Sequence, residues 1–198
     1  MAISLSKGQT ISLAKNSDSG LSKVFMGLGW DPVQKKSGGF LASLFGGGGG
    51  GEIDLDASVI LLDAAKTPVD TVSFGQLVSK DGAIRHGGDN LTGEGEGDDE
   101  VIYVNLTDLP SNVTHLVFTV NSFRGQTFNE VENAFCRLVD EAKNEELCRY
   151  TLTDQGGHTG VIMASMTRTP EGWTMTAHGK PGSGRTVNDL ADDAVSVI

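Results

Sequence analysis

Hydrophobic residues recur in short runs along most of the chain, and glycine, asparagine and aspartate separate one run from the next. Short apolar or alternating runs between turn-forming residues are typical of β-strands. Their spacing predicts an all-β domain, a β-sandwich of two antiparallel sheets. The expected strands lie at residues 9–14, 23–30, 52–62, 71–76, 100–106, 115–121, 134–139, 147–153, 159–167 and 172–177.

Two short segments are expected to be helical instead. Residues 127–134 begin with Thr127 and Glu130 at the spacing of a capping box, which predicts a short helical turn. Residues 186–195 carry apolar side chains at helical spacing, so a peripheral helix there should pack on the edge of the sandwich. Residues 134–153 read as a hairpin, with Asn144 suited to a left-handed turn position.

The chain is long enough to bury a core without disulfides or a metal, and its length favours one domain. We assign residues 1–180 to a single β-sandwich domain and residues 181–198 to a C-terminal tail with the short helix. Residues 35–51, KKSGGFLASLFGGGGGG, form a glycine-rich insertion. Six consecutive glycines do not hold a strand or helix, so we expect a flexible insertion. Its apolar residues leave a docking segment for a partner or a membrane as the alternative.

The formal net charge is −11, and its distribution is more informative than its total. Six acids and no base lie between Asp89 and Glu100, so more than half of the excess belongs to one segment. Binding to nucleic acid or directly to anionic lipid requires clustered lysine and arginine, which argues against both as partners. Divalent cations and basic partners fit the charge better.

The N-terminal residues contain no apolar run of signal-peptide length, and no apolar run approaches the ~20 residues of a membrane span. We therefore expect a cytoplasmic protein. Cys136 and Cys148 are too few for a disulfide framework and are expected to be reduced thiols. They lie on the two arms of the predicted hairpin, as core residues or, in the alternative, as a thiol pair with a redox role.

The segment GDNLTGEGEGDDE at residues 88–100 alternates carboxylates with glycines. Calcium takes six to eight oxygen ligands, and crowded carboxylates repel one another unless a cation lies between them. The segment is not an EF-hand, because Glu94 stands where that loop needs glycine. A phosphate-binding glycine loop would need a lysine, which the segment lacks. A cation site and a solvated acidic loop both remain possible on composition.

A second acidic cluster lies at EIDLDAS, residues 52–58. Strand alternation places Asp54 and Asp56 on one face, about 6.5–7 Å apart, with apolar residues on the other face. Asp31, in GLGWD, ends another apolar strand and is a third candidate. Three acidic segments on separate loops predict an open cation site at one end of the sandwich.

No catalytic constellation accompanies these acids. The four histidines are scattered without zinc-binding spacing, and His86, beside the acidic segment, is expected to be a loop histidine. Neither acidic motif contains a base to hold a phosphate, and no nucleophile motif occurs. We expect a protein that is not an enzyme.

Four segments together resemble the TerD family of tellurium-resistance and stress proteins. They are GLGWDP, IDLDAS, DTVSFGQLVSKDGAIRHGGDNLTGEGEGDDEVIYVNL and VFTVNSFRGQTFNEVENAFCRLVD. The similarity extends from the N-terminal SLSKGQTISL to about Ala177, and the insertion with its SLFGGG is most similar to the TerZ branch.

The resemblance implies a calcium-binding β-sandwich of the bacterial cytoplasm, without catalytic activity, in which two calcium ions would bring the formal charge to about −7. Other tellurite-resistance proteins are the implied partners, and a sensor or adaptor of the stress response is the implied role. A calcium-dependent membrane module, a thiol-based tellurite detoxifier and a scaffold are the alternatives. The implied metal ligands are Asp31, Asp54, Asp56, Asp89, Asn90, Thr92, Glu94, Glu96, Asp98, Asp99 and Glu100.

Overall fold

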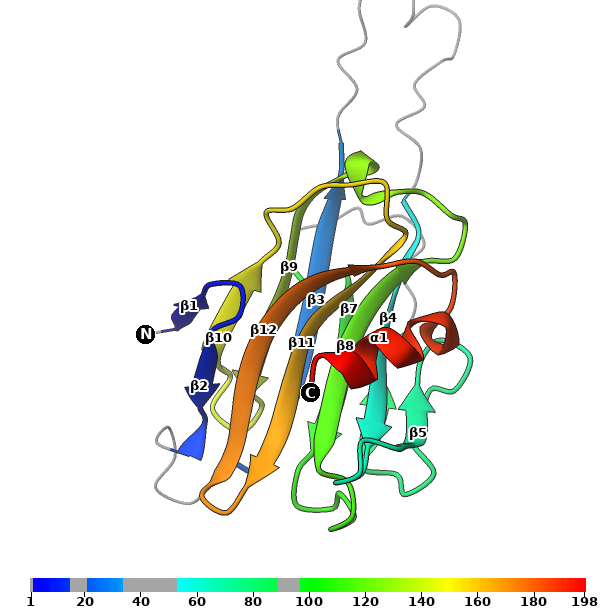
Figure 1. Ribbon diagram of the computed structural model, residues 1–198. Helices are drawn as coiled ribbons and strands as arrows, with labels where there is room; N and C mark the ends of the chain where they lie inside the picture. Colours follow the sequence, from blue (N-terminus) through cyan, green and yellow to red (C-terminus); the bar gives the residue numbers. More distant parts are fainter. Residues whose placement is uncertain (1, 15–20, 34–52, 89–96) are drawn as a thin grey trace, which may run out of the picture.

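Two six-stranded sheets pack face to face in the structure, a computed structural model that describes residues 2–14, 21–33, 53–88 and 97–198 (Figure 1). Sheet A has the order β1 (Ile3–Leu5), β10 (Glu145–Thr151), β9 (Val131–Asp140), β3 (Lys23–Pro32), β7 (Glu100–Asn105) and β6 (Ile84–His86). Sheet B has the order β2 (Thr10–Ser12), β12 (Gly172–Gly182), β11 (Gly160–Thr169), β8 (His115–Ser122), β4 (Leu55–Leu62) and β5 (Pro68–Val72). The predicted β-sandwich is confirmed.

Alternation along each strand builds the core between the sheets. On β4, Leu55, Ala57, Val59 and Leu61 belong to the central hydrophobic cluster, as the alternation predicts. The intervening residues face outward, and Ile60 among them joins a second cluster on the outer face of sheet B. The whole strand is consequently buried, although only one of its faces lines the core between the sheets.

The C-terminal residues cover that outer face. The 3-10 helix η4 (Val187–Leu190) continues into α1 (Ala191–Ser196), which lies across β8 and β4 in Figure 1. Val187, Leu190 and Ala194 pack with the outward apolar residues of β4, β8 and β11. The expectation that this helix packs on the edge of the sandwich is wrong, because the apolar residues that it covers lie on the outer face of sheet B.

Each predicted strand has a counterpart, and the differences concern short elements. The two missed strands, β1 and β6, have three residues each, and β1 pairs with β10 in parallel rather than antiparallel. The capping box of Thr127 and Glu130 forms, but the helical turn η3 (Phe128–Glu130) ends sooner than expected, because β9 begins at Val131. The β9–β10 hairpin turn contains Asn144 with φ of 49°, as predicted. The insertion at residues 35–51 lies outside the described residues.

Candidate functional site

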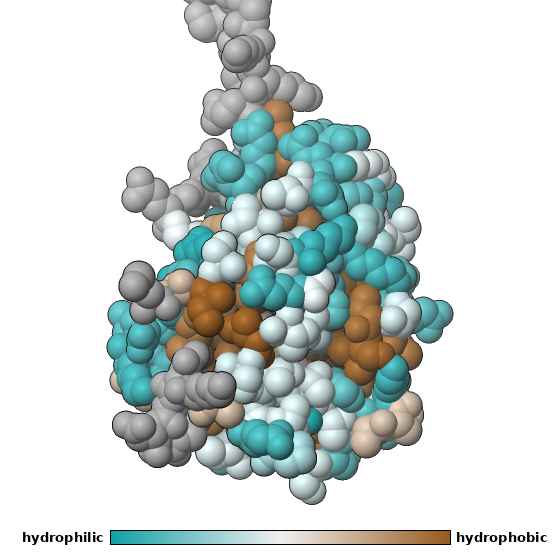
Figure 2. Space-filling view, turned by 60° about the vertical axis from the view of Figure 1, so that its left-hand side comes forward, coloured by the Kyte–Doolittle hydropathy of each residue, from teal (hydrophilic) through white to brown (hydrophobic). Residues whose placement is uncertain are grey.

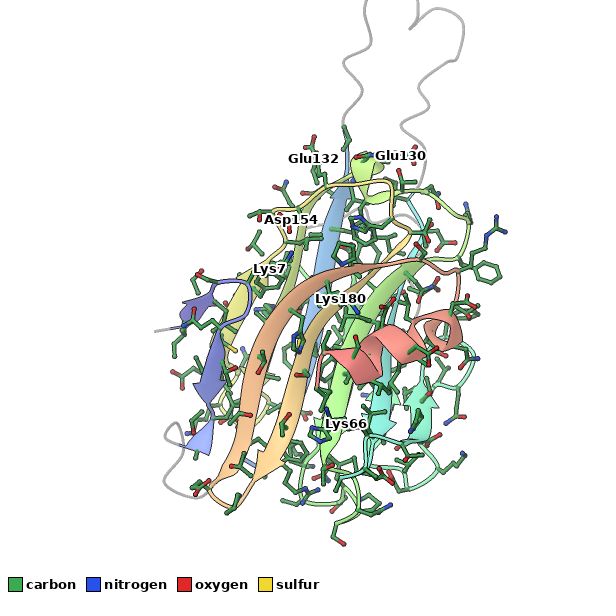
Figure 3. The ribbon with its side chains drawn as sticks, viewed as in Figure 1. Lys7, Lys66, Glu130, Glu132, Asp154 and Lys180 are labelled. Atoms are coloured by element: carbon green, nitrogen blue, oxygen red, sulfur yellow. The ribbon has the colours of Figure 1, made fainter. Side chains whose placement is uncertain are left out.

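The candidate site lies at the end of the sandwich where residues 97–99 cross β3. The Asp99 backbone N–H donates to the Leu28 carbonyl at 2.8 Å, and a carboxylate oxygen of Asp99 accepts from the Trp30 N–H at 2.7 Å. Asp31, near the end of β3, accepts a hydrogen bond from the Asn133 amide at 2.8 Å. The strand register places Glu132 opposite Asp31, and Figure 3 shows Glu130 and Glu132 at this same end. Carboxylates from three segments therefore gather here.

Burial and repulsion from the neighbouring carboxylates change the pKa of Asp99. Burial, together with the charges of Asp31, Glu100 and Asp98, raises the pKa of Asp99 to about 6, against the hydrogen bond from Trp30, which lowers it. A cation between Asp99 and Asp31 would relieve that repulsion.

Asp31 and Asp99 share a pocket of about 450 Å³ with residues of β9 and β10. Its wall includes Phe135 and Arg149, and the Arg149 guanidinium lies 4.3 Å from the centre of the Phe135 ring. Arg149 also donates two hydrogen bonds to Glu146, at 3.1 and 2.9 Å. Hydrophilic side chains cover much of the upper end of the molecule in Figure 2. The sequence analysis missed Arg149, since only the sheet register brings residue 149 next to residues 31 and 99.

The glycines of GLGWDP explain how residues 97–99 reach over β3. Gly27 faces outward on sheet A, and a Cβ there would overlap the carboxylate of Asp98. Because that space is open, Asp98 lies on the strand and accepts two hydrogen bonds from Arg137 of β9, at 2.7 and 2.8 Å. Asp98 is thus engaged in a bidentate ion pair on the outer face of sheet A.

Glu100 points the other way, into the sandwich. It lies opposite Leu28 in the register and is 2% exposed, which places its side chain on the inner face with the core. One carboxylate oxygen accepts from the Ala57 N–H of β4 at 2.7 Å and lies 3.3 Å from His86 Nε2. Glu100 therefore links the two sheets.

His86 is the second residue that the sequence analysis misjudged. It was expected in a loop, but it lies on β6, is 3% exposed, and faces Glu100. The Gly88 N–H donates to His86 Nδ1 at 3.2 Å, so Nδ1 carries no proton and Nε2–H is the donor toward the Ala57 carbonyl, 3.1 Å away. The signal was the alternation of Ile84 and His86, a run too short to identify as a strand.

Of the two acids of the IDLDAS motif, Asp56 lies on β4 of sheet B and Asp54 directly precedes that strand. Asp54 pairs with Arg124 Nε at 2.9 Å, and Asp56 lies opposite Asn121 on the outward face of β4, 4% exposed. Across the described ranges, no three histidine, cysteine, aspartate or glutamate side chains come close enough to hold a metal ion. Five predicted ligands lie outside those ranges: Asp89, Asn90, Thr92, Glu94 and Glu96.

The two cysteines are unpaired and buried in the core. Burial raises the pKa of the Cys148 thiol to about 12, and it also raises the pKa of Cys136 far above its ordinary value. Since the thiolate is the reactive form, this environment disfavours thiol chemistry. In the part of the chain that the structure covers, no helix is long and apolar enough to cross a membrane.

A model of the TerD domain matches residues 1–193. The tellurium resistance protein TerZ of Serratia marcescens is 55% identical over 196 residues, which cover 99% of this chain and 98% of that protein. The stress response protein SCP2 of Bacillus subtilis (strain 168) is 44% identical, and the match covers 96% of this chain and 98% of that protein.

The fold is similar to that of a homologue of telluride resistance protein (TerD) from Streptomyces coelicolor A3(2), whose crystal structure is known. The TM-score is 0.66 at 23% identity, and the match covers 87% of this chain and 96% of that one. At this identity the likeness shows a shared fold.

Proposed function

The chain belongs to the TerD family of tellurium-resistance and stress-response proteins, and from that premise we propose that it is a calcium-binding, non-catalytic sensor or adaptor of the cytoplasm. The observation that carries the proposal is the pair of acids at the pocket. Asp31 and Asp99 line one cavity, and the pKa of Asp99 is raised to about 6 by burial and neighbouring carboxylates.

The donor set of the pocket fits calcium. Asp31 and Asp99 supply carboxylate oxygens, and the backbone of Gly97 lines the same cavity. These are hard oxygen ligands of the kind that calcium prefers. Further ligands to complete six to eight are expected from water and from the acids of residues 89–96, which remain predictions. A second ion near Asp54 and Asp56 also remains a prediction.

The charge of the site supports the proposed role as a sensor or adaptor. When bound, calcium supplies two positive charges to a site dominated by carboxylates. The Trp30 N–H holds the carboxylate of Asp99 at the pocket, and the Leu28 carbonyl accepts from the backbone N–H of Asp99. Neutralising this end of the sandwich changes which protein surface it attracts, and other tellurite-resistance proteins are the proposed partners.

Isothermal titration of the metal-free protein with calcium tests the proposal. We expect saturable binding that weakens at least about tenfold in Asp31→Asn and in Asp99→Asn, because each loses a carboxylate ligand. Asp70→Asn is the matched control, since Asp70 also accepts backbone and side-chain hydrogen bonds but lies at the β4–β5 edge. Absent binding in the wild type, or equal affinities in all four proteins, would overturn the proposal.

One observation favours calcium-dependent membrane binding as a second candidate. Phe74 and Phe123 are 41% and 49% exposed, and their rings contact edge to face at 5.6 Å. Phe123 directly precedes Arg124, which pairs with Asp54. Co-sedimentation with anionic liposomes, with and without calcium, separates the candidates: calcium-dependent pelleting that Phe123→Ser abolishes favours the membrane, and equal pelleting excludes it.

A further inference from the structure

Arg149 is the one feature of the pocket that calcium binding leaves unexplained. It lies on the wall of a cavity that also contains Asp31 and Asp99, yet the two hydrogen bonds that it donates both go to Glu146. These bonds use Nε and one terminal nitrogen, and no hydrogen bond among the described residues uses the other terminal nitrogen, Nη1. A guanidinium with a remaining donor at a cavity wall is a group that recognises oxyanions.

Arg149 is also held in place before any ligand arrives. Its bidentate contact with Glu146 fixes the plane of the guanidinium, and the Phe135 ring supports one face at 4.3 Å. Arg137 donates to the same Glu146 at 3.3 Å, so the acceptor is itself positioned. Binding a ligand would therefore immobilise little additional side chain, which favours affinity.

The charge of the pocket decides when an anion can enter. Without metal, the carboxylates of Asp31 and Asp99 face the cavity and Glu146 offsets the charge of Arg149, so anions are repelled. A calcium ion on those two carboxylates would cancel their charge, and the Arg149 guanidinium, which lines the same cavity, would then be available to an anion.

We propose that the calcium-loaded pocket binds a small oxyanion, a phosphate, phosphate monoester or tellurium oxyanion, which bridges the metal and the Arg149 guanidinium. This inference rests on the proposed function, because the metal supplies one of the two contacts. The cavity, at about 450 Å³, lies in the ~300–1,000 Å³ range of small-molecule sites and exceeds the need of a bare oxyanion. It therefore has room for an organic phosphate ester. Thr151 also lines the cavity, and its hydroxyl adds an uncharged donor to the charged donor of Arg149.

Linkage makes the inference measurable. If the oxyanion and calcium contact each other in one pocket, each must raise the affinity of the other by the same factor. The test is calcium titration of the wild type in chloride buffer and again with inorganic phosphate, with methyl phosphate or with tellurite. We expect phosphate or its ester to tighten calcium binding at least about fivefold, the low end of such couplings. Tellurite in the same assay shows whether the tellurium oxyanion shares the site.

Arg149→Ala and Arg149→Gln remove the proposed anion contact, and the glutamine keeps a side chain on Phe135. In chloride, loss of a positive charge near the metal should leave calcium binding no weaker than in the wild type. With phosphate, the tightening of calcium binding should disappear. The variants should therefore bind calcium no more weakly than the wild type in chloride, but more weakly than the wild type in phosphate. Arg85→Ala is the matched control, because Arg85 lies 4.4 Å over the Tyr103 ring on the same sheet but outside the pocket. It should keep the full effect.

The outcomes distinguish the two proposals. Calcium binding that no oxyanion changes, or a phosphate effect that survives both Arg149 variants, would overturn this inference and leave calcium binding standing. Absence of calcium binding in every buffer would overturn both. Calcium binding seen only with phosphate present would support the inference in its strongest form.

Discussion

Replacing Glu100 by alanine should destabilise the fold far more than replacing an exposed glutamate. Glu100 is 2% exposed, and one of its oxygens accepts from the Ala57 N–H at 2.7 Å and lies 3.3 Å from His86 Nε2. The alanine would leave that N–H and the imidazole without this acceptor inside the sandwich. The Ala57 N–H that loses its partner costs about 1–3 kcal/mol, and the buried space that the side chain vacates adds to this, so we expect a loss of about 2–5 kcal/mol in the free energy of unfolding.

Urea unfolding followed by the fluorescence of the buried Trp30 and Trp173 measures this loss. Glu100→Gln should cost less, because its amide oxygen still accepts from Ala57. Glu145→Ala is the control, since Glu145 is exposed at the start of β10. A Glu100→Ala midpoint equal to that of the control would refute the assignment of Glu100 as a link between the sheets and return it to the list of metal ligands.

Three further results are expected. Gly27→Ala should lower the free energy of unfolding by about 1–3 kcal/mol, because its Cβ displaces the Asp98 carboxylate that lies on the strand. Gly157→Ala should be near neutral, because its Cβ meets no described atom within 4 Å. The midpoints of urea unfolding compare the two variants. The folded state raises the pKa of Asp99 from 3.8 to about 6, so it binds this proton more tightly than the unfolded chain does. The metal-free protein should therefore lose stability as the pH rises through this interval. An Asp99→Asn protein that loses as much stability would contradict the raised pKa of Asp99. Cys136 and Cys148 should resist a thiol reagent at pH 8 until urea is added, and rapid labelling of the folded protein would show that they are not buried.

The strands and the sandwich were predictable because their signals are local. Alternation on β4 identifies Leu55 and Ala57 as core residues without knowledge of the partner strand. The missed strands have three residues each, too few for a period to appear, and their pairing depends on neighbours distant in the sequence. The position of the C-terminal helix depended on the outer face of sheet B, which no local pattern describes.

The acids of the site were predictable as a group, but their individual roles were not. Composition marks Asp98, Asp99 and Glu100 as one cluster, whereas the structure directs Asp98 to Arg137, Asp99 to the pocket and Glu100 into the core. These directions follow from the open space at Gly27 and from sheet register. Arg149 was invisible for the same reason, because a base far along the chain enters the pocket only through the pairing of β9 with β10.

A crystal structure determined with calcium tests the central claim most directly. We predict an ion within about 2.3–2.6 Å of carboxylate oxygens of both Asp31 and Asp99, with Glu100 still bound to the Ala57 N–H. An ion bound elsewhere, with Asp31 and Asp99 free of it, would contradict the claim that these two acids form the calcium site.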